Sequence, residues 1–352
     1  MKKILKILLY LVVLLVILFG VFLLYATIND FKPDPRITLY ENDSPDAIND
    51  TSVINLMIWN IGYCGLSQEM DFFYDGGENV RATKTSTVNN LSGVSKFLSN
   101  QKETDIFLLQ EVDKEAKRSW SMNQYDSIAA LYPAYTPIFG VNYDVFFVPQ
   151  PLSEPMGKVL GGLMTLSRYK VSRTVRHSFP GNYSWPVGLF FLDRCFMVNR
   201  YPLNNQKELL VINTHNSAYD DGSLRKQQMD FLENFLSEEY AKGNYIIVGG
   251  DWNQSPPNFK NNFADNIMDN ENRSDISAEY LSDWNWVYNS NVPTNRRVAT
   301  PYKKGKSLTT VIDYFLLSPN IELLKSENID LNFEYSDHQP VKISIKLKTP
   351  AN

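Results

Sequence analysis

The pair Asp337-His338, in the run YSDHQPVKISIKL, lies just before an alternating apolar segment, Val341–Leu347. The chain has three histidines, and His215, like His338, stands at the edge of an apolar run beside polar residues. Hydrolysis of a phosphate ester requires carboxylates that hold a hard cation, a base for water and a donor for the developing charge. An acid beside a histidine is therefore a candidate part of such a site.

Several apolar runs end or begin at residues that can take part in catalysis. Four runs end in this way: Ile54–Trp59 at Asn60, Asp105–Leu109 at Gln110-Glu111, Leu209–Ile212 at Asn213-Thr214-His215, and Tyr245–Val248 at Gly249-Gly250-Asp251-Trp252-Asn253. In two later runs the polar residues come before the apolar ones, since Asp313 opens one strand and Asp337-His338 precede another. If the later strands are antiparallel to the earlier ones, these ends and starts meet at one sheet edge. One cleft would then gather eight residues: Asn60, Glu111, His215, Asp251, Asn253, Asp313, Asp337 and His338.

The types of these residues suit a metal-assisted attack on phosphorus. Glu111, with Asn60 and Asp337, offers the hard oxygen ligands that Mg²⁺ or Mn²⁺ prefers. Asp251 can orient and deprotonate a water for in-line attack. Asn253 follows two residues later in an extended segment, so it points to the same side and can hold Asp251 or a phosphate oxygen.

The two histidines supply donors. His338 can donate to the phosphoryl oxygens, with Asp313 setting its tautomer and raising its pKa. His215 is a second donor or a leaving-group acid. Taken singly, each segment also fits an ordinary structural role, such as a turn or a solvated strand end. Their joint occurrence in this order favours the catalytic interpretation.

The surrounding periodicity predicts a layered domain of strands interleaved with a few helices. Val80–Asn100 and Ser223–Lys242 have apolar residues at helical steps, and Lys242-Gly243 is a C-terminal stop. This pattern predicts one layered α/β or α+β domain of residues 53–349, after an irregular Pro- and Asp-rich linker, 29–52. The predicted strands are Ile54–Trp59, Asp105–Leu109, Gly162–Leu166, Leu189–Val198, Leu209–Asn213, Tyr245–Val248, Val311–Leu317 and Val341–Leu347.

The amino terminus, residues 1–28, has the composition of a membrane anchor. A basic head with Lys2, Lys3 and Lys6 precedes Ile7–Ala26, which carries no charge. Twenty helical residues span about 30 Å, the thickness of the hydrocarbon layer. The basic head favours a cytoplasmic amino terminus with the rest across the membrane. A cleaved signal peptide is the alternative, and either reading places the domain outside the cytoplasm.

Net charge and cysteine content argue against two kinds of binding, non-specific nucleic-acid binding and zinc binding. Removing the three lysines of the basic head from the formal net charge of −5 leaves −8 for the rest of the chain. An acidic domain of this kind does not favour non-specific nucleic-acid binding. Cys64 and Cys195 lack zinc-ligand spacing and read as two buried small side chains, with a disulfide between them left open.

These segments resemble the endonuclease/exonuclease/phosphatase superfamily, which includes pancreatic-type deoxyribonucleases, abasic-site endonucleases, neutral sphingomyelinases and inositol-polyphosphate 5-phosphatases. The resemblance implies a four-layered α/β sandwich of two packed mixed sheets with helices outside. It also implies the roles given above, with Glu111 as the metal ligand and Asp251 as the water-activating base. The matching segments are Trp59-Asn60, Gln110-Glu111, Asn213-Thr214-His215, Gly250-Asp251-Trp252-Asn253, Ile312-Asp313-Tyr314 and Ser336-Asp337-His338-Gln339-Pro340-Val341.

Two departures narrow the resemblance. Abasic-site endonucleases usually carry an acid where this chain has Gly62, and they lack the element that Thr214-His215 supplies. The chain is therefore more similar to the deoxyribonuclease, sphingomyelinase and 5-phosphatase branches. Its segments Asn60–Tyr63 and Asp71–Gly77 are also similar to a membrane-anchored bacterial subgroup.

Some residues outside these motifs have two readings. Arg194 is a charge within an apolar run, and it either contacts a substrate phosphate or pairs on a solvent face. Tyr143 and Trp185 either line the cleft or a membrane-facing rim, or pack as ordinary loop aromatics. His177 is expected to be structural or exposed.

The sequence thus predicts a membrane-anchored, divalent-metal-dependent phosphoesterase, with a phosphodiester favoured and a lipid head group as one candidate substrate. An extracytoplasmic nuclease is the alternative. A catalytically inactive binding protein is a remote alternative, because an inactive relative would be expected to have lost Glu111, Asp251 or His338. No protein partner is inferred.

Overall fold

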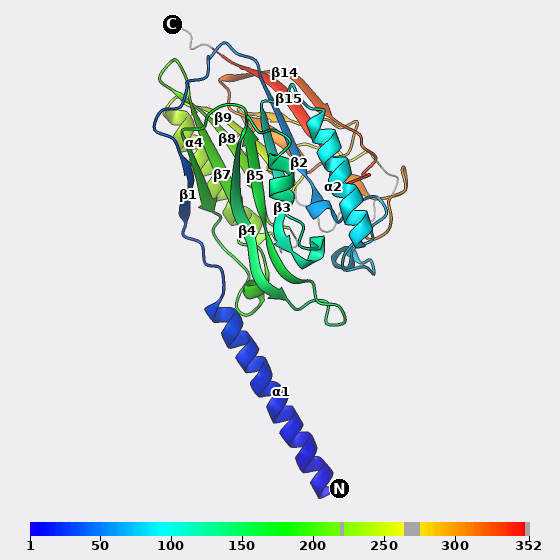
Figure 1. Cartoon of the computed structure of the whole chain (residues 1–352). Coiled ribbons are helices and arrows are strands. Elements are labelled where there is room, and N and C mark those ends of the chain that lie inside the picture. The colour runs from blue at the N-terminus through cyan, green and yellow to red at the C-terminus, as the bar shows by residue number, and fades with distance from the viewer. Residues whose placement is uncertain (219–221, 264–274, 349–352) are drawn as a thin grey trace.

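A computed structural model describes residues 1–218, 222–263 and 275–348. The strands of these residues form two large mixed sheets packed face to face, with a long helix on the outer face of each (Figure 1). The expected four-layered α/β sandwich is confirmed. The two sheets bring together strands that are far apart in sequence, and this is what assembles the site.

The first sheet has seven strands and combines parallel and antiparallel pairs. β8 and β9 are parallel, and β9 pairs antiparallel with β13. In spatial order the strands are β1 (Arg36–Glu41), β6 (Arg173–Ser178), β7 (Cys195–Pro202), β8 (Glu208–His215), β9 (Tyr245–Asp251), β13 (Asp313–Leu317) and β10 (Asn285–Val287).

The second sheet has six strands with the same mixed character. β2 and β3 are parallel, and β15 pairs antiparallel with β2. In spatial order the strands are β14 (Ile321–Asn328), β15 (Val341–Leu347), β2 (Ile54–Asn60), β3 (Ile106–Ala116), β5 (Gly157–Ser167) and β4 (Thr136–Val148). A separate two-stranded ribbon joins β11 (Asn295–Arg296) to β12 (Thr309–Thr310).

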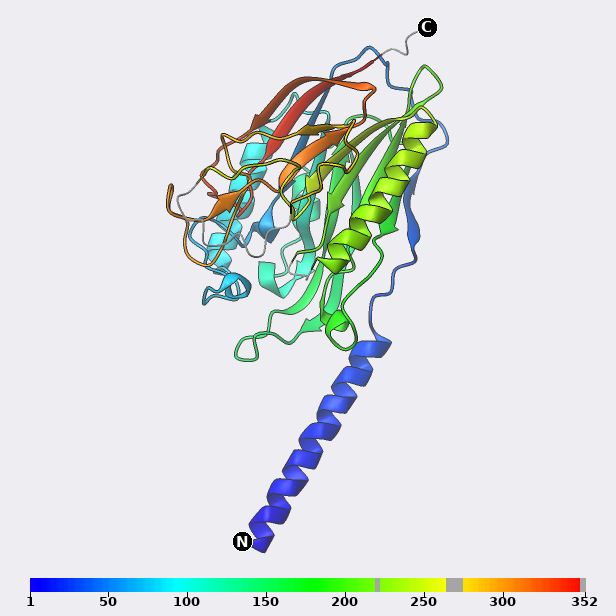
Figure 2. The same cartoon turned by 180° about the vertical axis from the view of Figure 1, so that it is seen from behind.

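Alternation along the strands explains the layers. In β2, Ile54 and Ile58 belong to the cluster between the two sheets, whereas Met57 and Trp59 belong to the cluster under helix α2 (Lys84–Ser99). Successive side chains of a strand point to opposite faces, so a strand covered on both sides is apolar throughout. Helix α4 (Ser223–Ala241) covers the outer face of the first sheet in the same way, as the view from behind shows (Figure 2).

Short helical segments lie between several of the strands. The helix α3 (Gln124–Ala129) packs on β3, and the described residues also form four 3₁₀ turns. These turns are η1 (Gly62–Cys64), η2 (Phe73–Asp75), η3 (Lys117–Ser119) and η4 (Val187–Phe190). Cys64 and Cys195 are both buried and free, which matches the expectation of two small core side chains.

Helix α1 (Lys2–Ile28) projects away from the sandwich and carries the amino terminus at its far end (Figures 1 and 2). Its mean hydropathy over an 18-residue window is 3.3, and none of that window is buried against the rest of the chain. By length and composition it can cross a membrane, although a signal segment has the same properties.

Three sequence expectations need correction. The predicted strand Leu189–Val198 is wrong at its start, because the strand begins at Cys195 and Leu189 and Phe190 form the end of the 3₁₀ turn η4 instead. The predicted linker 29–52 contains β1, which pairs with β6 and widens the first sheet. The predicted helix from Val80 begins instead at Lys84, because Thr83 caps it by accepting a hydrogen bond from the Ser86 N–H.

The two sheets are joined by a buried amide as well as by apolar packing. Asn213 on β8 donates from Nδ2 to the carbonyls of Leu109 and Met164 on the second sheet, at 3.2 and 3.1 Å. Its Oδ1 accepts a hydrogen bond from Gln110 Nε2 at 2.7 Å. A buried polar group that loses its partners costs about 1–3 kcal/mol, so this amide fixes how β3 and β8 face each other.

We therefore expect Asn213→Leu to lower the free energy of unfolding by about 3 kcal/mol, because it removes these bonds without changing side-chain volume much. Denaturant unfolding of the full chain in detergent micelles measures this. Asn204→Leu, at an exposed asparagine in the turn between β7 and β8, is the control. Equal unfolding midpoints for the two variants would contradict the role given to Asn213.

Candidate active site

The eight predicted residues lie at one edge of the sandwich. β2 ends with Asn60 opposite Gln110 of β3, and β8 and β9 end with His215 opposite Asp251. β3 itself continues past this point to Ala116, so the predicted strand end at Leu109 is wrong. β13 starts here, with Asp313 opposite Asp251, because it is antiparallel to β9. Asp337 and His338 precede β15, which is antiparallel to β2. The expected meeting of strand ends and strand starts is thus what the structure shows.

Glu111 is aimed by an irregularity in β3. The pairing of β3 with β5 slips between Leu109 and Val112, and Glu111 within this bulge has a φ of 54°. A non-glycine residue in the left-handed region is uncommon, and bulges re-aim side chains near functional sites. Gln110 meanwhile points between the sheets to Asn213. Of these two neighbouring residues, Gln110 therefore belongs to the core and Glu111 to the site.

Asp251 and Asn253 are placed by the end of β9. Gly249 and Gly250 belong to β9, so the alternative interpretation of this glycine pair as part of a turn is wrong. A Cβ on Gly250, whose φ is +151°, would lie 2.0 Å from the Thr214 carbonyl oxygen of β8, and only glycine fits. Asn253 then donates its backbone N–H to Asp251 Oδ1 at 2.9 Å and its Nδ2 to the Asn216 carbonyl at 2.9 Å.

The Asn60 side chain lies at the centre of the site and is fully buried. Its Nδ2 donates to Asp251 Oδ2 at 3.0 Å and to Glu111 Oε1 at 3.2 Å. Its Oδ1 accepts from the Gly62 N–H at 2.9 Å, which identifies the oxygen side of the amide. Asn60 therefore joins the carboxylates of both sheets, and one lone pair of its oxygen is left for another ligand.

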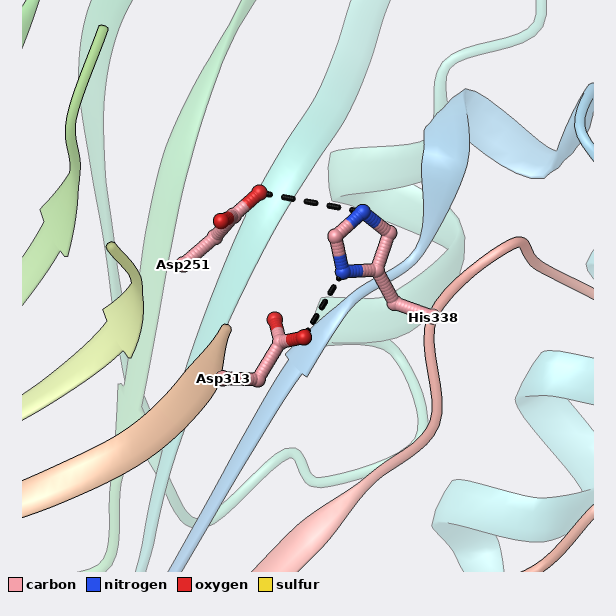
Figure 3. A group of neighbouring side chains, drawn as sticks. All are labelled: Asp251, Asp313 and His338. Atoms are coloured by element: carbon pink, nitrogen blue, oxygen red, sulfur yellow. Dashed lines mark hydrogen bonds and ion pairs between the residues drawn. The ribbon is translucent and has the colours of Figure 1, made fainter. Parts of the chain in front are cut away.

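His338 lies between two carboxylates (Figure 3). Its Nδ1 is 2.8 Å from Asp313 Oδ2, and its Nε2 is 3.7 Å from Asp251 Oδ2. Asp313 is fixed in turn, since its backbone N–H donates to Thr294 Oγ1 at 3.0 Å. The expected acid–histidine pair is therefore present, with Nε2 directed into the site.

The charges around His338 decide its protonation. Burial alone lowers the pKa of His338, but the carboxylates of Asp313, Asp337 and Asp251 outweigh burial and raise this pKa well above the ordinary value. Burial raises the pKa of Asp313, and the His338 imidazolium opposes that shift. We place the shared proton on the imidazole, because three carboxylates face it and one imidazolium neutralises part of their charge.

His215 has the opposite character. Its Nε2 lies 3.4 Å from Asp251 Oδ2 and 3.9 Å from Glu111 Oε1. Burial lowers its pKa well below the ordinary value, and the charges of Arg194 and His338 lower it further. At neutral pH the ring is therefore neutral and can donate one hydrogen bond. This leaves it able to act as a donor, but not as a cationic acid.

Glu111 and Asp337 are the best candidates for holding a cation. Burial raises the pKa of Asp337 to about 7; the charge of His338 opposes the shift, and the Glu111 carboxylate adds to it. Two carboxylates that repel each other in a buried space suit a divalent cation, whose charge would offset the repulsion. Gly62 keeps this space open, because a Cβ there would lie 2.7 Å from Asp337 Oδ1.

A second group could also hold a metal by geometry. One ligand atom each from Asp251, Asp313 and His338 lie within 4.8 Å of one another. However, His338 Nδ1 is already bonded to Asp313, so these two residues do not direct free ligand atoms toward one metal ion. The geometry of these three residues suits proton transfer better than metal binding.

Arg194 lies close to this edge. It precedes β7 and is half-buried. Its charge adds to the burial that lowers the pKa of His215, and it opposes the burial that raises the pKa of Tyr143. Arg118, in η3, also lowers the pKa of His215 while it pairs with Asp113 at 2.9 Å. Both arginines thus bring positive charge toward the site, and a phosphate-binding role for Arg194 stays a prediction.

The sequence reading missed Asn295 and Thr294. Asn295 Nδ2 lies 3.1 Å from His338 Nε2, and it can donate there only while Nε2 is unprotonated. In the imidazolium state the Asn295 amide must present its oxygen instead. Thr294 precedes β11 and Asn295 opens it, and this two-residue strand is too short to show periodicity, so no local signal marked them.

Comparison with known proteins identifies the class. The profile of the endonuclease/exonuclease/phosphatase family matches residues 57–338, which is most of the chain. The chain belongs to this family, and it is an enzyme that hydrolyses phosphoester bonds. Family members generally depend on divalent metals, in agreement with the carboxylates gathered here. No curated protein matches the chain in sequence.

Solved structures share the fold at low sequence identity. An endonuclease/exonuclease/phosphatase from Beutenbergia cavernae DSM 12333 aligns with 84% of this chain and 72% of its own, at 16% identity and a TM-score of 0.60. ANGEL2, a 2′,3′-cyclic phosphatase solved with adenosine-2′,3′-vanadate, aligns with 90% and 100%, at 14% identity and a TM-score of 0.56. D. rerio TDP2, solved with a single-strand DNA product, aligns with 84% and 99%, at 12% identity and a TM-score of 0.53. At these identities the neighbours establish the fold alone.

We expect Asp313→Asn to lower the pKa of His338, because it removes the carboxylate bonded to Nδ1. A raised histidine pKa stabilises the protonated form, and that form is lost as pH rises through the folded-state value. The alkaline fall in kcat/KM should therefore begin at lower pH in the variant. NMR titration of the His338 ring measures the same change directly.

The control for this variant is Asp105→Asn, a buried aspartate at the opposite end of β3 that pairs with Arg168 at 2.9 Å. It should leave the His338 titration unchanged. An unchanged titration in Asp313→Asn as well would show that Asp313 does not set the protonation of His338.

Proposed function

We propose that this chain is a membrane-anchored phosphodiesterase that uses Mg²⁺, or Mn²⁺, and a water activated by Asp251. The observation that carries the proposal is the position of Asp251. Its Oδ2 accepts from Asn60 Nδ2 at 3.0 Å and lies 3.4 Å from His215 Nε2, while its Oδ1 accepts from the Asn253 N–H. A buried carboxylate held on several sides is oriented to take a proton from an attacking water.

Glu111 and Asp337, with the oxygen of Asn60, would hold the cation. When bound, the cation polarises the phosphoryl oxygen and offsets the charge of the incoming phosphate ester. The placing of these three residues beside one another supports the assignment, since Asn60 bonds to Glu111 and Gly62 abuts Asp337.

His338 is proposed to donate from Nε2 to a phosphoryl oxygen as negative charge builds. Its imidazolium state, sustained by Asp313, makes this donor stronger than a neutral ring. His215 is proposed as a second, neutral donor, and Asn253 as the residue that positions Asp251. Arg194 is proposed to contact a substrate phosphate, because it lies near enough for its charge to help lower the pKa of His215.

The anchor and its orientation belong to the same proposal. Helix α1 has the length and hydropathy to cross a bilayer, and its three lysines lie before the apolar run. The excess of lysine on that side favours a cytoplasmic amino terminus and an extracytoplasmic domain, residues 53–349. A phosphodiester at the membrane surface, such as a lipid head group, is then within reach. A nuclease of external DNA or RNA is the alternative.

The test uses the full chain in nanodiscs with Mg²⁺ and three substrates: phospholipids, single-stranded DNA and a small soluble phosphodiester. We expect Asp251→Asn and His338→Ala to lower kcat/KM by about 10³-fold, the typical loss when one such group is removed. EDTA should abolish activity, and Mg²⁺ should restore it.

His177→Ala is the matched control, because His177 is buried against Phe196 with ring centroids 4.9 Å apart and lies outside the site. It should keep wild-type activity. Equal turnover by the wild type and both site variants on every substrate would refute the catalytic assignment. Turnover of DNA but not of phospholipid would select the nuclease alternative.

A further inference from the structure

Exposed apolar side chains outside α1 are unevenly distributed over the described residues. Among the large ones, three lie on other elements: Val53 before β2, Val88 on helix α2 and Leu324 on β14. The other five lie on connections beyond the carboxyl ends of β2, β3 and β4 or around η4, and we call them the rim. The rim residues and their exposed fractions are Tyr74 (38%), Trp120 (42%), Leu152 (88%), Trp185 (63%) and Val187 (46%).

The segments that carry the rim are bound to one another. Arg81 pairs with Glu154, in the connection between β4 and β5, and its guanidinium lies 6.0 Å from the Trp120 ring. Tyr143 Oη donates to the Phe190 carbonyl of η4 at 3.1 Å. Phe73, beside Tyr74 in η2, packs in the same cluster as Tyr143 and Phe190. The segments that carry the rim are therefore neighbours at one end of the sandwich.

Helix α1 meets these segments directly. Its Phe22 packs against Phe146, Phe147 and Phe190, with ring centroids 5.9, 6.2 and 5.8 Å away. Trp185 Nε1 donates to Thr27 Oγ1, in the last turn of α1, at 3.1 Å. The connection between β4 and β5 lies at the same end of the sandwich as this junction (Figures 1 and 2).

These contacts fix the depth of the rim. Phe22 lies within the uncharged run Ile7–Ala26, four residues before its end, which is about 6 Å along a helix. If that run fills the hydrocarbon layer, side chains packed on Phe22 lie at the boundary between lipid tails and head groups. Tryptophan and tyrosine are enriched at that boundary, because they combine an apolar ring with a polar atom.

The strand directions show which way the active site faces. β3 and β4 are parallel to each other, because both are antiparallel to β5. The pairings through β5 place Val112 of β3 level with Val141 of β4, and Phe146 is five residues farther along, or about 17 Å. The edge that carries Glu111 therefore faces the end where α1 enters the membrane.

We propose that the rim docks on the surface of the bilayer that α1 enters, so that the active-site edge faces the lipid head groups of the same membrane. The partner is a phospholipid surface. The proposal rests on the proposed anchor and gives the substrate class: phosphoesters presented at that surface. Rim and helix together set the orientation of the domain, which one helix alone would leave free to tilt.

The test places a fluorescent label at the rim of the full chain in phosphatidylcholine vesicles that contain phosphatidylcholine with a nitroxide on its acyl chain. Leu152→Cys and Val187→Cys provide the sites, and labelling is selective because Cys64 and Cys195 are 0% exposed. Asn204→Cys, in the turn at the amino end of β8, is the control. We expect several-fold stronger quenching at both rim positions than at position 204.

Flotation of the labelled chain with the vesicles tests the anchor separately. If the chain does not float, the anchor itself is wrong, and the docking inference fails with it. If it floats but the rim labels are quenched no more than the control, the rim proposal alone is overturned. A blue-shifted rim label that the nitroxide does not quench would show that a second copy covers the rim, and would overturn it as well.

A second measurement uses the proposed activity. The double variant Leu152→Asp, Val187→Asp should lose several-fold in kcat/KM on vesicle phospholipid while hydrolysis of a small soluble phosphodiester is unchanged. Equal activity of the variant and the wild type on vesicles would overturn the docking proposal without touching the catalytic assignment.

Discussion

The repulsion among buried carboxylates is the constraint on which the rest of this site depends. Glu111, Asp251 and Asp313 converge from three strands, and Asp337 comes from the segment before β15; three of the four are almost completely buried. Taking charges out of water is costly unless each is paired or hydrogen-bonded. The Asn60 amide, the His338 imidazolium and the place for a divalent cation are the features that reduce this cost.

The two packed sheets hold these carboxylates close together despite their repulsion. Sheet hydrogen bonds hold the backbone at each strand end, and the buried amide of Asn213 fixes one sheet against the other. Backbone conformations that are unfavourable locally, such as the positive φ of Glu111 and Asn253, persist because the surrounding strands determine them. The site is thus arranged before substrate arrives, which is the condition for electrostatic catalysis.

Much of the site could be predicted from sequence because most of its residues lie at or next to the ends and starts of strands, and these are local features. The apolar run before Asp251 and the one after His338 each have a clear length and boundary, and antiparallel pairing then brings them together. Asn295 could not be found this way, since it reaches His338 from the two-residue strand β11, which is too short to show periodicity. The bulge that aims Glu111 and the strand β1 in the expected linker depend on pairing with distant partners, so their own residues do not reveal them.

The most direct test of the central claim is the thermal unfolding of the full chain in nanodiscs with and without Mg²⁺, for the wild type and for Glu111→Gln. If these carboxylates are held together to bind a cation, Mg²⁺ raises the Tm of the wild type, because a ligand that binds only the folded state stabilises it. Glu111→Gln should unfold no earlier than the metal-free wild type, since it removes a repelling charge, and it should lose the response to Mg²⁺. A wild-type Tm that does not respond to Mg²⁺, or an equal response in both proteins, would contradict the account.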